Sequence, residues 1–176
     1  GGEVLLRGIC PSDLKVPLEE FQKAGAAVEA DEKNRQIRIC MGKRPLPLLI
    51  KTEPYPGFPT DLQSPFMAFL ATAQGTSYIE EQVFEGRFAT AKILEQMGAV
   101  IRTEDQRAVI EGHYPLKGAA VNACDLRGGA ALMVAALAAE GDTFIGECHH
   151  IERGYEDICR DMAALGAHIR WVGKDS

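Results

Sequence analysis

Two aspartates and three arginines recur in similar positions along the chain, and they are the side chains best suited to chemistry. Asp61 and Asp125 each precede an apolar run of helical character. Arg87 follows Asp61 by 26 residues, Arg153 follows Asp125 by 28 residues, and Arg127 lies beside the second aspartate. A carboxylate can accept a proton, and guanidinium groups bind carboxylates and phosphates through two parallel hydrogen bonds. The pattern therefore predicts a site for an anionic ligand at the helix ends.

Each of these residues also has a simpler interpretation. An aspartate directly before a helix is a common N-cap, and on spacing alone capping is favoured over catalysis for both Asp61 and Asp125. Any one of the arginines would be explained by solvent exposure or by pairing with a neighbouring glutamate. Asp61, however, ends the segment 54–60, whose three prolines restrict where its carboxylate points. That rigidity favours a working group, and both interpretations stay open at this stage.

Larger segments recur as well, which indicates a repeat protein. Gly25-Ala26, Gly98-Ala99 and Gly166-Ala167 each end an amphipathic helix, at spacings of 73 and 68 residues. The first of these helices lacks the Asp-led apolar helix that precedes the other two. We therefore expect three copies, the first of them truncated, and a natural protein that continues upstream of Gly1. The expected copies are approximately residues 1–45, 46–115 and 116–176.

Apolar periodicity and glycine stops predict the elements of an α/β protein. The predicted helices are Leu14–Ala24, Leu62–Ala73, Phe88–Met97, Leu126–Ala138 and Tyr155–Leu165. The predicted strands are Val4–Ile9, Ala27–Ala30, Gln36–Cys40, Leu48–Lys51, Thr76–Glu80, Val100–Thr103, Ala108–Glu111, Ala119–Asn122, Thr143–Gly146 and His168–Trp171. The second and fourth helices are apolar almost all the way round, so we expect them to be enclosed, with helices central and sheets outside.

Composition narrows the class of protein. The 176 residues are 46% hydrophobic and carry a net charge of −6 without a Lys/Arg stripe, which argues against nucleic-acid or anionic membrane partners. No apolar run reaches the roughly 20 residues of a membrane span. Five scattered cysteines without a signal peptide indicate a reducing, cytoplasmic protein.

Consecutive residues of an extended segment point to opposite faces, so Cys148-His149-His150 is interpreted as structural and no metal is expected. Cys124 is expected to be a small buried filler.

Five segments of the chain together form a specific pattern. In order, they are Pro54-Tyr55-Pro56-Gly57-Phe58-Pro59-Thr60-Asp61-Leu62-Gln63, Val83-Phe84-Glu85-Gly86-Arg87-Phe88, Met97-Gly98-Ala99, Cys124-Asp125-Leu126-Arg127 and His150-Ile151-Glu152-Arg153-Gly154-Tyr155-Glu156. These segments closely resemble those of the bacterial UDP-N-acetylglucosamine enolpyruvyl transferases. The resemblance covers nearly the whole chain but only the C-terminal part of those enzymes.

The resemblance implies an architecture and a partner. Members of the family have two domains, each an inside-out α/β barrel of three βαβαββ units with central helices and outer sheets. This chain is similar to the C-terminal domain with its start missing. The implied partner is the missing N-terminal domain of the same enzyme, which carries the family's reactive cysteine and most phosphate-binding arginines. The chain by itself is therefore expected to be inactive.

The resemblance also implies a reaction and roles for residues. The enolpyruvyl group of phosphoenolpyruvate is transferred to the 3-hydroxyl of UDP-N-acetylglucosamine, the first committed step of peptidoglycan synthesis, without a cofactor. Asp61 resembles the carboxylate that binds the sugar hydroxyl and carries its proton, and Arg153 resembles the arginine that binds phosphoenolpyruvate. The remaining implied substrate-binding residues are Val83, Phe84, Arg87, Asp125, Leu126 and Arg127.

Two alternatives remain at the level of sequence. One is the related transferase that acts on shikimate 3-phosphate and shares the architecture. The other is a non-catalytic module that binds a nucleotide sugar.

Overall fold

The N-terminal part of the chain is a three-stranded antiparallel sheet with one helix. A computed structural model describes residues 2–173. Its first sheet has the order β1 (Gly2–Arg7), β3 (Gln36–Met41), β2 (Ala27–Asp31). The short 3-10 helix Pro11–Leu14 and α1 (Lys15–Lys23) connect β1 to β2. Within the described residues β1 pairs only with β3, so its other edge is open.

The middle of the chain contains one unit with the order βαβαββ. Its strands are β4 (Leu49–Lys51), β5 (Thr76–Glu80), β6 (Val100–Glu104) and β7 (Arg107–Glu111). They form a sheet of order β4-β5-β7-β6, in which β4 and β5 are parallel and the other pairs antiparallel. Helix α2 (Gln63–Leu70) connects β4 to β5, and α3 (Ala89–Gln96) connects β5 to β6.

The C-terminal part repeats the beginning of this order in shorter strands. β8 (Leu116–Lys117) pairs with β10 (Ala139–Glu140), and β9 (Ala120–Asn122) pairs with β11 (Phe144–Gly146), both in parallel. The helices of this part are α4 (Leu126–Ala136), α5 (His149–Glu152) and α6 (Ile158–Ala164). The α/β class expected from the sequence is thus observed, and each predicted helix is two or four residues shorter in the structure.

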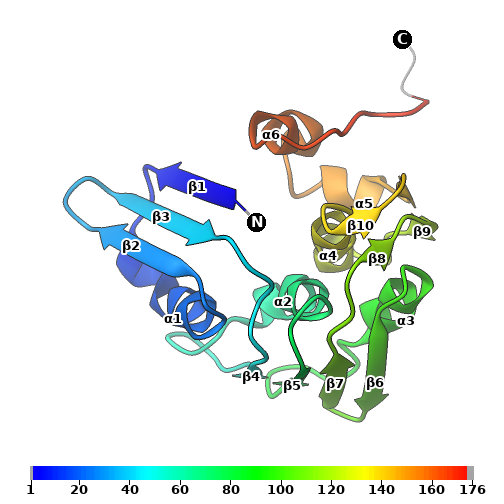
Figure 1. The fold of residues 1–176 in the computed structure, drawn as a ribbon, viewed down its shortest axis with the longest axis horizontal. Coiled ribbons are helices and arrows are strands. Elements are labelled where there is room, and N and C mark those ends of the chain that lie inside the picture. Colours follow the sequence, from blue (N-terminus) through cyan, green and yellow to red (C-terminus); the bar gives the residue numbers. More distant parts are fainter. Residues whose placement is uncertain (1, 174–176) are drawn as a thin grey trace.

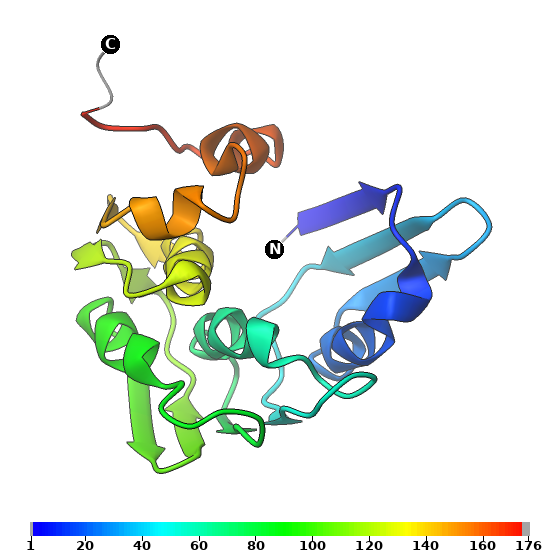
Figure 2. The ribbon, with the colours of Figure 1, turned by 180° about the vertical axis from the view of Figure 1, so that it is seen from behind.

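Helices α2 and α4 lie beside each other in the middle of the molecule, while the sheets lie towards its periphery (Figures 1 and 2). Both helices carry fully buried side chains, among them Met67 and Leu70 on α2 and Leu132 on α4. Burial of this kind supplies most of the free energy that holds two helices together. The sequence-based expectation that the two apolar helices are enclosed is therefore confirmed.

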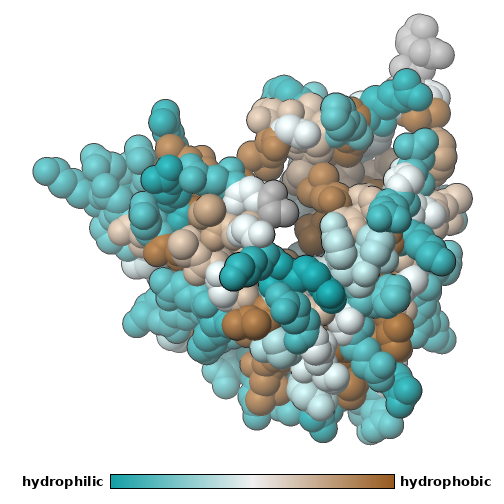
Figure 3. Space-filling model, viewed as in Figure 1, coloured by the Kyte–Doolittle hydropathy of each residue, from teal (hydrophilic) through white to brown (hydrophobic). Residues whose placement is uncertain are grey.

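Part of the apolar surface stays open near the N-terminal sheet. Leu5 and Leu6 on β1 are 44% and 38% exposed. Hydrophobic side chains also line a hollow between the part built on β1 to β3 and the part that carries α6 (Figure 3). Among residues 2–173, no helix is long and apolar enough to cross a membrane.

The predicted strand His168–Trp171 is wrong, because these residues form no regular strand. A strand needs a neighbouring strand, and within residues 2–173 this segment belongs to none of the observed sheets. Instead, Ile169 and Trp171 pack by their side chains against a small core that includes Ile151 and Ile158. The alternation of apolar residues correctly predicted that these side chains are at least partly buried. It wrongly predicted that the backbone pairs in a sheet.

Glycines in α4 allow other helices to approach closely. A Cβ on Gly129 would lie 2.4 Å from Cγ1 of Ile151 on α5, and a Cβ on Gly128 would lie 2.9 Å from Oγ1 of Thr90 on α3. Ile151 is fully buried and β-branched, so it cannot easily move away. The tight contact between α4 and α5 therefore depends on the missing side chain.

We predict that Gly129→Ala lowers the free energy of unfolding by about 1–3 kcal/mol, because overpacking outweighs the better helix propensity of alanine. Urea denaturation followed by circular dichroism measures the change. Gly42→Ala is the matched control, since no atom lies within 4 Å of its added Cβ. A Gly129→Ala protein as stable as the parent would show that α5 is not held at this distance.

Candidate active site

The loop before α2 is anchored so that it presents Asp61 at the surface. Phe58 is 3% exposed, and its ring packs edge-on against Phe66 of α2 with centroids 4.9 Å apart. The amide of Glu53 donates to the carbonyl of Phe58 at 2.9 Å, which closes the loop at its base. The side chain of Asp61 is 64% exposed. A buried aromatic anchor three residues away thus holds an exposed carboxylate in place.

The two aspartates that resemble each other in sequence do different things. Oδ1 of Asp125 accepts a hydrogen bond from the amide of Gly128 at 2.6 Å, so Asp125 is the N-cap of α4. Asp61 lies inside a short 3-10 helix, Thr60–Leu62, and caps neither that helix nor α2. The capping interpretation is confirmed for Asp125 and wrong for Asp61. The extra 3-10 turn moves Asp61 away from the amides it would otherwise cap.

Asp61 instead forms an ion pair with an arginine 66 residues later in the chain. Nε and Nη2 of Arg127 both lie 2.5 Å from Oδ1 of Asp61. Arg127 is the second residue of α4, so the contact joins the start of α4 to the loop before α2. The Arg127 side chain is 33% exposed, which leaves the pair open to a ligand. The structure therefore brings together the predicted carboxylate and one of the predicted cations.

The segment after β5 is tied to the same loop by a buried glutamate. Glu81 is 1% exposed. Its Oε1 accepts hydrogen bonds from the amides of Val83 and Phe84 at 3.0 and 3.1 Å. Its Oε2 accepts from the hydroxyl of Thr60 at 2.9 Å, and Thr60 immediately precedes Asp61. The predicted backbone site at Val83 and Phe84 is thereby held next to the aspartate.

Arg87 and Arg153 are each placed by contacts of their own segments. The guanidinium carbon of Arg87 lies 4.4 Å from the centroid of the half-exposed Phe84 ring, a cation–π contact. Arg153 follows α5 and is exposed, and the next residue, Gly154, approaches the Leu126 side chain so closely that an added Cβ would be 2.5 Å away. Leu126 precedes Arg127. Within residues 2–173, Arg127 is thus the predicted arginine that forms an ion pair with Asp61, while Arg87 lies beside Phe84 and the segment after Arg153 lies beside Leu126.

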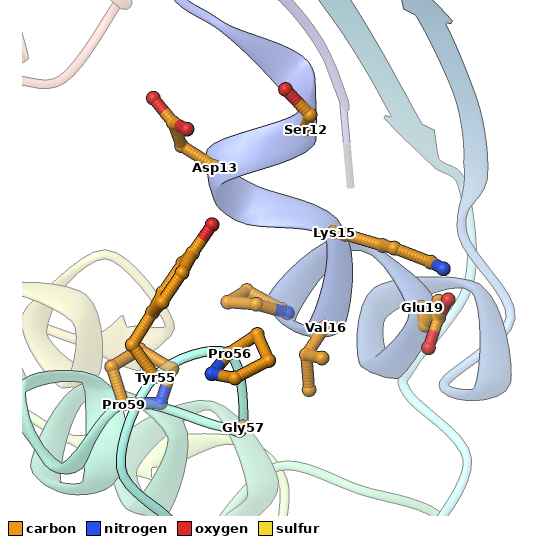
Figure 4. Close-up of a pocket in the computed structure, with 10 residues that line it drawn as sticks. Ser12, Asp13, Lys15, Val16, Glu19, Tyr55, Pro56, Gly57 and Pro59 are labelled. Carbon is orange, nitrogen blue, oxygen red and sulfur yellow. The ribbon is translucent and has the colours of Figure 1, made fainter.

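A hollow of about 410 Å³ lies beside the same loop but does not suit an anion (Figure 4). Tyr55 and Pro56 line one side, and residues 12–19 at the start of α1 line the other. Its charged residues are Asp13, Glu19 and Lys15, so negative charge predominates. None of the predicted arginines lines it. The anion site expected from the sequence therefore does not coincide with this hollow.

Two smaller expectations need correction. Cys124 is exposed, with its sulfur 3.7 Å from Oγ1 of Thr90, so it is not a buried filler. His149 and His150 lie on helix α5 with ring centroids 4.0 Å apart, whereas the sequence argument assumed an extended segment. Nδ1 of His149 lies 3.3 Å from a carboxylate oxygen of Glu147. Within residues 2–173, no three His, Cys, Asp or Glu side chains are grouped as metal ligands would be.

Sequence reasoning missed Glu81 and Thr60. Glu81 follows Glu80 directly after a strand, which looks like an ordinary charged strand end. Its carboxylate also binds the hydroxyl of Thr60, which lies 21 residues earlier, and that contact is not local in sequence. A weak signal exists, since a strand that alternates in burial directs residue 81 to the same face as Ile79.

Comparisons with known proteins find relatives that match most of the chain. The sequence model of EPSP synthase (3-phosphoshikimate 1-carboxyvinyltransferase) matches residues 1–162. A UDP-N-acetylglucosamine 1-carboxyvinyltransferase from Desulfofundulus thermocisternus is 46% identical over 96% of this chain and 68% of its own length. UDP-N-acetylglucosamine 1-carboxyvinyltransferase 3 from Symbiobacterium thermophilum is 43% identical over 96% of this chain, which spans 39% of that relative. The crystal structure of the enolpyruvyl transferase NikO from Streptomyces tendae superposes with a TM-score of 0.85 at 29% identity, over 96% of this chain and 40% of that one.

The different roles of the two aspartates are testable by stability. We predict that Asp125→Ala lowers the free energy of unfolding by about 1 kcal/mol, while Asp125→Asn, which can still cap, lowers it much less. At position 61 the Ala and Asn variants should differ little from each other, since an exposed ion pair contributes only about 0–1 kcal/mol and no cap is lost. Urea denaturation of the four variants provides the measurement. A clear advantage of Asn over Ala at position 61 would contradict the assignment.

Proposed function

The chain belongs to the EPSP synthase (3-phosphoshikimate 1-carboxyvinyltransferase) family, and from this premise we propose that it is part of an enolpyruvyl transferase whose acceptor is UDP-N-acetylglucosamine and whose donor is phosphoenolpyruvate. The observation that carries the proposal is the ion pair between Asp61 and Arg127, formed from segments 66 residues apart. The names of relatives at 43–46% identity support the choice of acceptor. The step proposed is the first committed one of peptidoglycan synthesis.

The chemistry requires a base, an acid and several positive charges. The oxygen of the 3-hydroxyl forms a bond to C2 of phosphoenolpyruvate, while a proton is added to the methylene carbon, giving a tetrahedral ketal. Loss of a proton from the new methyl group and departure of phosphate then regenerate the double bond. Asp61 is the group proposed to take the proton of the sugar hydroxyl, and its position on a rigid loop suits that role.

The arginines are proposed to hold the anionic donor. Arg153 is exposed and, in the described part of the chain, its guanidinium makes no ion pair, so it is free to bind a carboxylate or phosphate. Arg127, paired with Asp61, and Arg87, beside Phe84, are proposed to act with it, and Asp125 and Leu126 form the turn that carries Arg127. Fixed cations of this kind stabilise negative charge as it develops during addition and elimination. No metal or organic cofactor has a part in the proposed steps.

The sugar nucleotide is proposed to lie against the segment after β5. The amides of Val83 and Phe84 are engaged by Glu81, so the backbone there has one defined conformation. Phe84 is 49% exposed and offers an apolar face beside Arg87. The rigid backbone of Val83 and Phe84, next to the Asp61 loop, is suited to hold the sugar with its 3-hydroxyl towards the Asp61 carboxylate.

We further propose that the chain supplies one wall of a two-walled cleft and is inactive alone. It spans about two fifths of one relative and of NikO, and 68% of another. The βαβαββ order of the middle unit and the open edge of β1 support three copies, at approximately residues 1–45, 46–115 and 116–176, arranged as an inside-out barrel. The other wall belongs to an N-terminal domain of the same enzyme. Five free cysteines support a reducing compartment such as the cytoplasm.

The acceptor is tested with the complete two-domain enzyme. Phosphate release from phosphoenolpyruvate is measured with UDP-N-acetylglucosamine and, separately, with shikimate 3-phosphate. We expect turnover with the first acceptor only. Turnover with shikimate 3-phosphate alone would establish the related transferase instead. Calorimetric binding of UDP-N-acetylglucosamine to residues 1–176, combined with no transfer by the complete enzyme, would favour a binding module.

The role of Asp61 is tested by Asp61→Asn in the same enzyme. We predict a fall in kcat of at least about 100-fold, because an amide cannot accept the hydroxyl proton. Asp105→Asn, the same change in the exposed turn between β6 and β7, is the control and should leave kcat unaltered. Circular dichroism checks that both variants fold. Full turnover in Asp61→Asn would show that Asp61 only pairs with Arg127.

A further inference from the structure

Three hydrogen bonds converge on one buried carboxylate beside the site. Glu81 is 1% exposed, and both of its oxygens are used. Oε1 accepts from the amides of Val83 and Phe84, and Oε2 accepts from the hydroxyl of Thr60. Burying a charged group is costly unless it is fully hydrogen-bonded, so such an arrangement persists only where all the donors are in place. Here the donors come from two different loops.

The backbone around Glu81 is itself held rigidly. Its amide donates to the carbonyl of Gln106 in the turn between β6 and β7 at 2.8 Å. The amide of the next residue, Gln82, donates to Oγ1 of the fully buried Thr52 at 2.8 Å. Because the main chain on both sides is anchored to the sheet, the position of the Glu81 carboxylate is defined by the sheet. The carboxylate can therefore hold the Thr60 hydroxyl and the amides of Val83 and Phe84 in constant positions.

We propose that Glu81 is a positioning residue that sets the distance between Asp61 and the backbone at Val83 and Phe84. This inference rests on the proposed function, in which those groups hold one substrate, the sugar nucleotide. Thr60 is directly bonded to Asp61, so the hydrogen bond to Oε2 constrains the loop that presents the aspartate. The bonds to Oε1 constrain the strip that faces the sugar. Glu81 itself is buried and does not touch the substrate.

The three donors determine which replacement of Glu81 preserves the hydrogen bonds. In Glu81→Gln the amide oxygen can still accept from the two backbone N–H groups, and its NH2 can donate to the Thr60 hydroxyl, which also accepts. In Glu81→Leu all three donors lose their partner. Thr60→Val removes only the bond between the loops, whereas Thr60→Ser retains a hydroxyl. These two pairs of variants separate the hydrogen bonds from side-chain volume.

The test uses steady-state kinetics of the complete enzyme with each substrate varied in turn. For Glu81→Leu we expect KM for UDP-N-acetylglucosamine to rise at least about 10-fold and kcat to fall, with KM for phosphoenolpyruvate changed less than about 3-fold. Glu81→Gln and Thr60→Ser should stay within about 3-fold of the parent in every constant. Thr60→Val should raise KM for the sugar nucleotide alone. A merely structural role would reduce the amount of folded enzyme, which lowers apparent kcat and leaves both KM values unchanged.

Ser77→Ala is the matched control for loss of a buried hydrogen bond. Ser77 is fully buried at the other end of β5 and accepts from the amide of Leu48, away from the site. It should alter stability and neither KM. An unchanged KM for the sugar nucleotide in Glu81→Leu would overturn the inference; if that variant fails to fold, an unchanged KM in Thr60→Val overturns it. The parent enzyme is assayed first. If it transfers no enolpyruvyl group, the proposed function is refuted, and this outcome is distinct from a failure of the inference about Glu81.

Discussion

The packing of α2 against α4 is the constraint on which the candidate site depends. Both helices are apolar and enclosed, and their starts lie side by side, as the contact between Arg127 and the loop before α2 requires. Burial of their side chains fixes the relation of the two helices, and the polar residues at their starts follow. The apolar core brings the two loops near each other. The hydrogen bonds to Glu81 then hold the Thr60 loop against the segment at Val83 and Phe84.

The small residues of α4 are a second part of the same constraint. Gly128 and Gly129 allow α3 and α5 to approach α4 on two sides. The approach of α5 directs the chain that follows it, with Arg153 and Gly154, towards Leu126 at the start of α4. The positions of the arginines therefore depend on backbone contacts within the core. Uncharged residues in the core thus determine where the segments that carry Arg127 and Arg153 lie.

The two repeated segments differ in what their aspartate does. Asp125 closes the end of α4 and keeps its cap, whereas the extra 3-10 turn at Thr60–Leu62 releases Asp61 from that role. The carboxylate that is freed is the one that faces an arginine and solvent. Glu81 then replaces the lost local support, since its hydrogen bond to Thr60 holds the loop in place of a cap. One repeat retains the structural use of the aspartate, and the other makes it available to a ligand.

The sequence by itself determined the α/β class, the approximate ranges of most helices and strands, and the apolar character of the two central helices, and it named the candidate residues of the site; it missed β8, β10 and α5. These follow from apolar periodicity, glycine stops and recurrent motifs, which act over a few residues or a copy. Only the tertiary structure decided that Asp61 pairs with Arg127, that Glu81 is buried, that Cys124 is exposed and that His168–Trp171 is not a strand. Each of these depends on neighbours that are distant in sequence. A local pattern records which face of an element is apolar, but it does not record which other element will lie against that face.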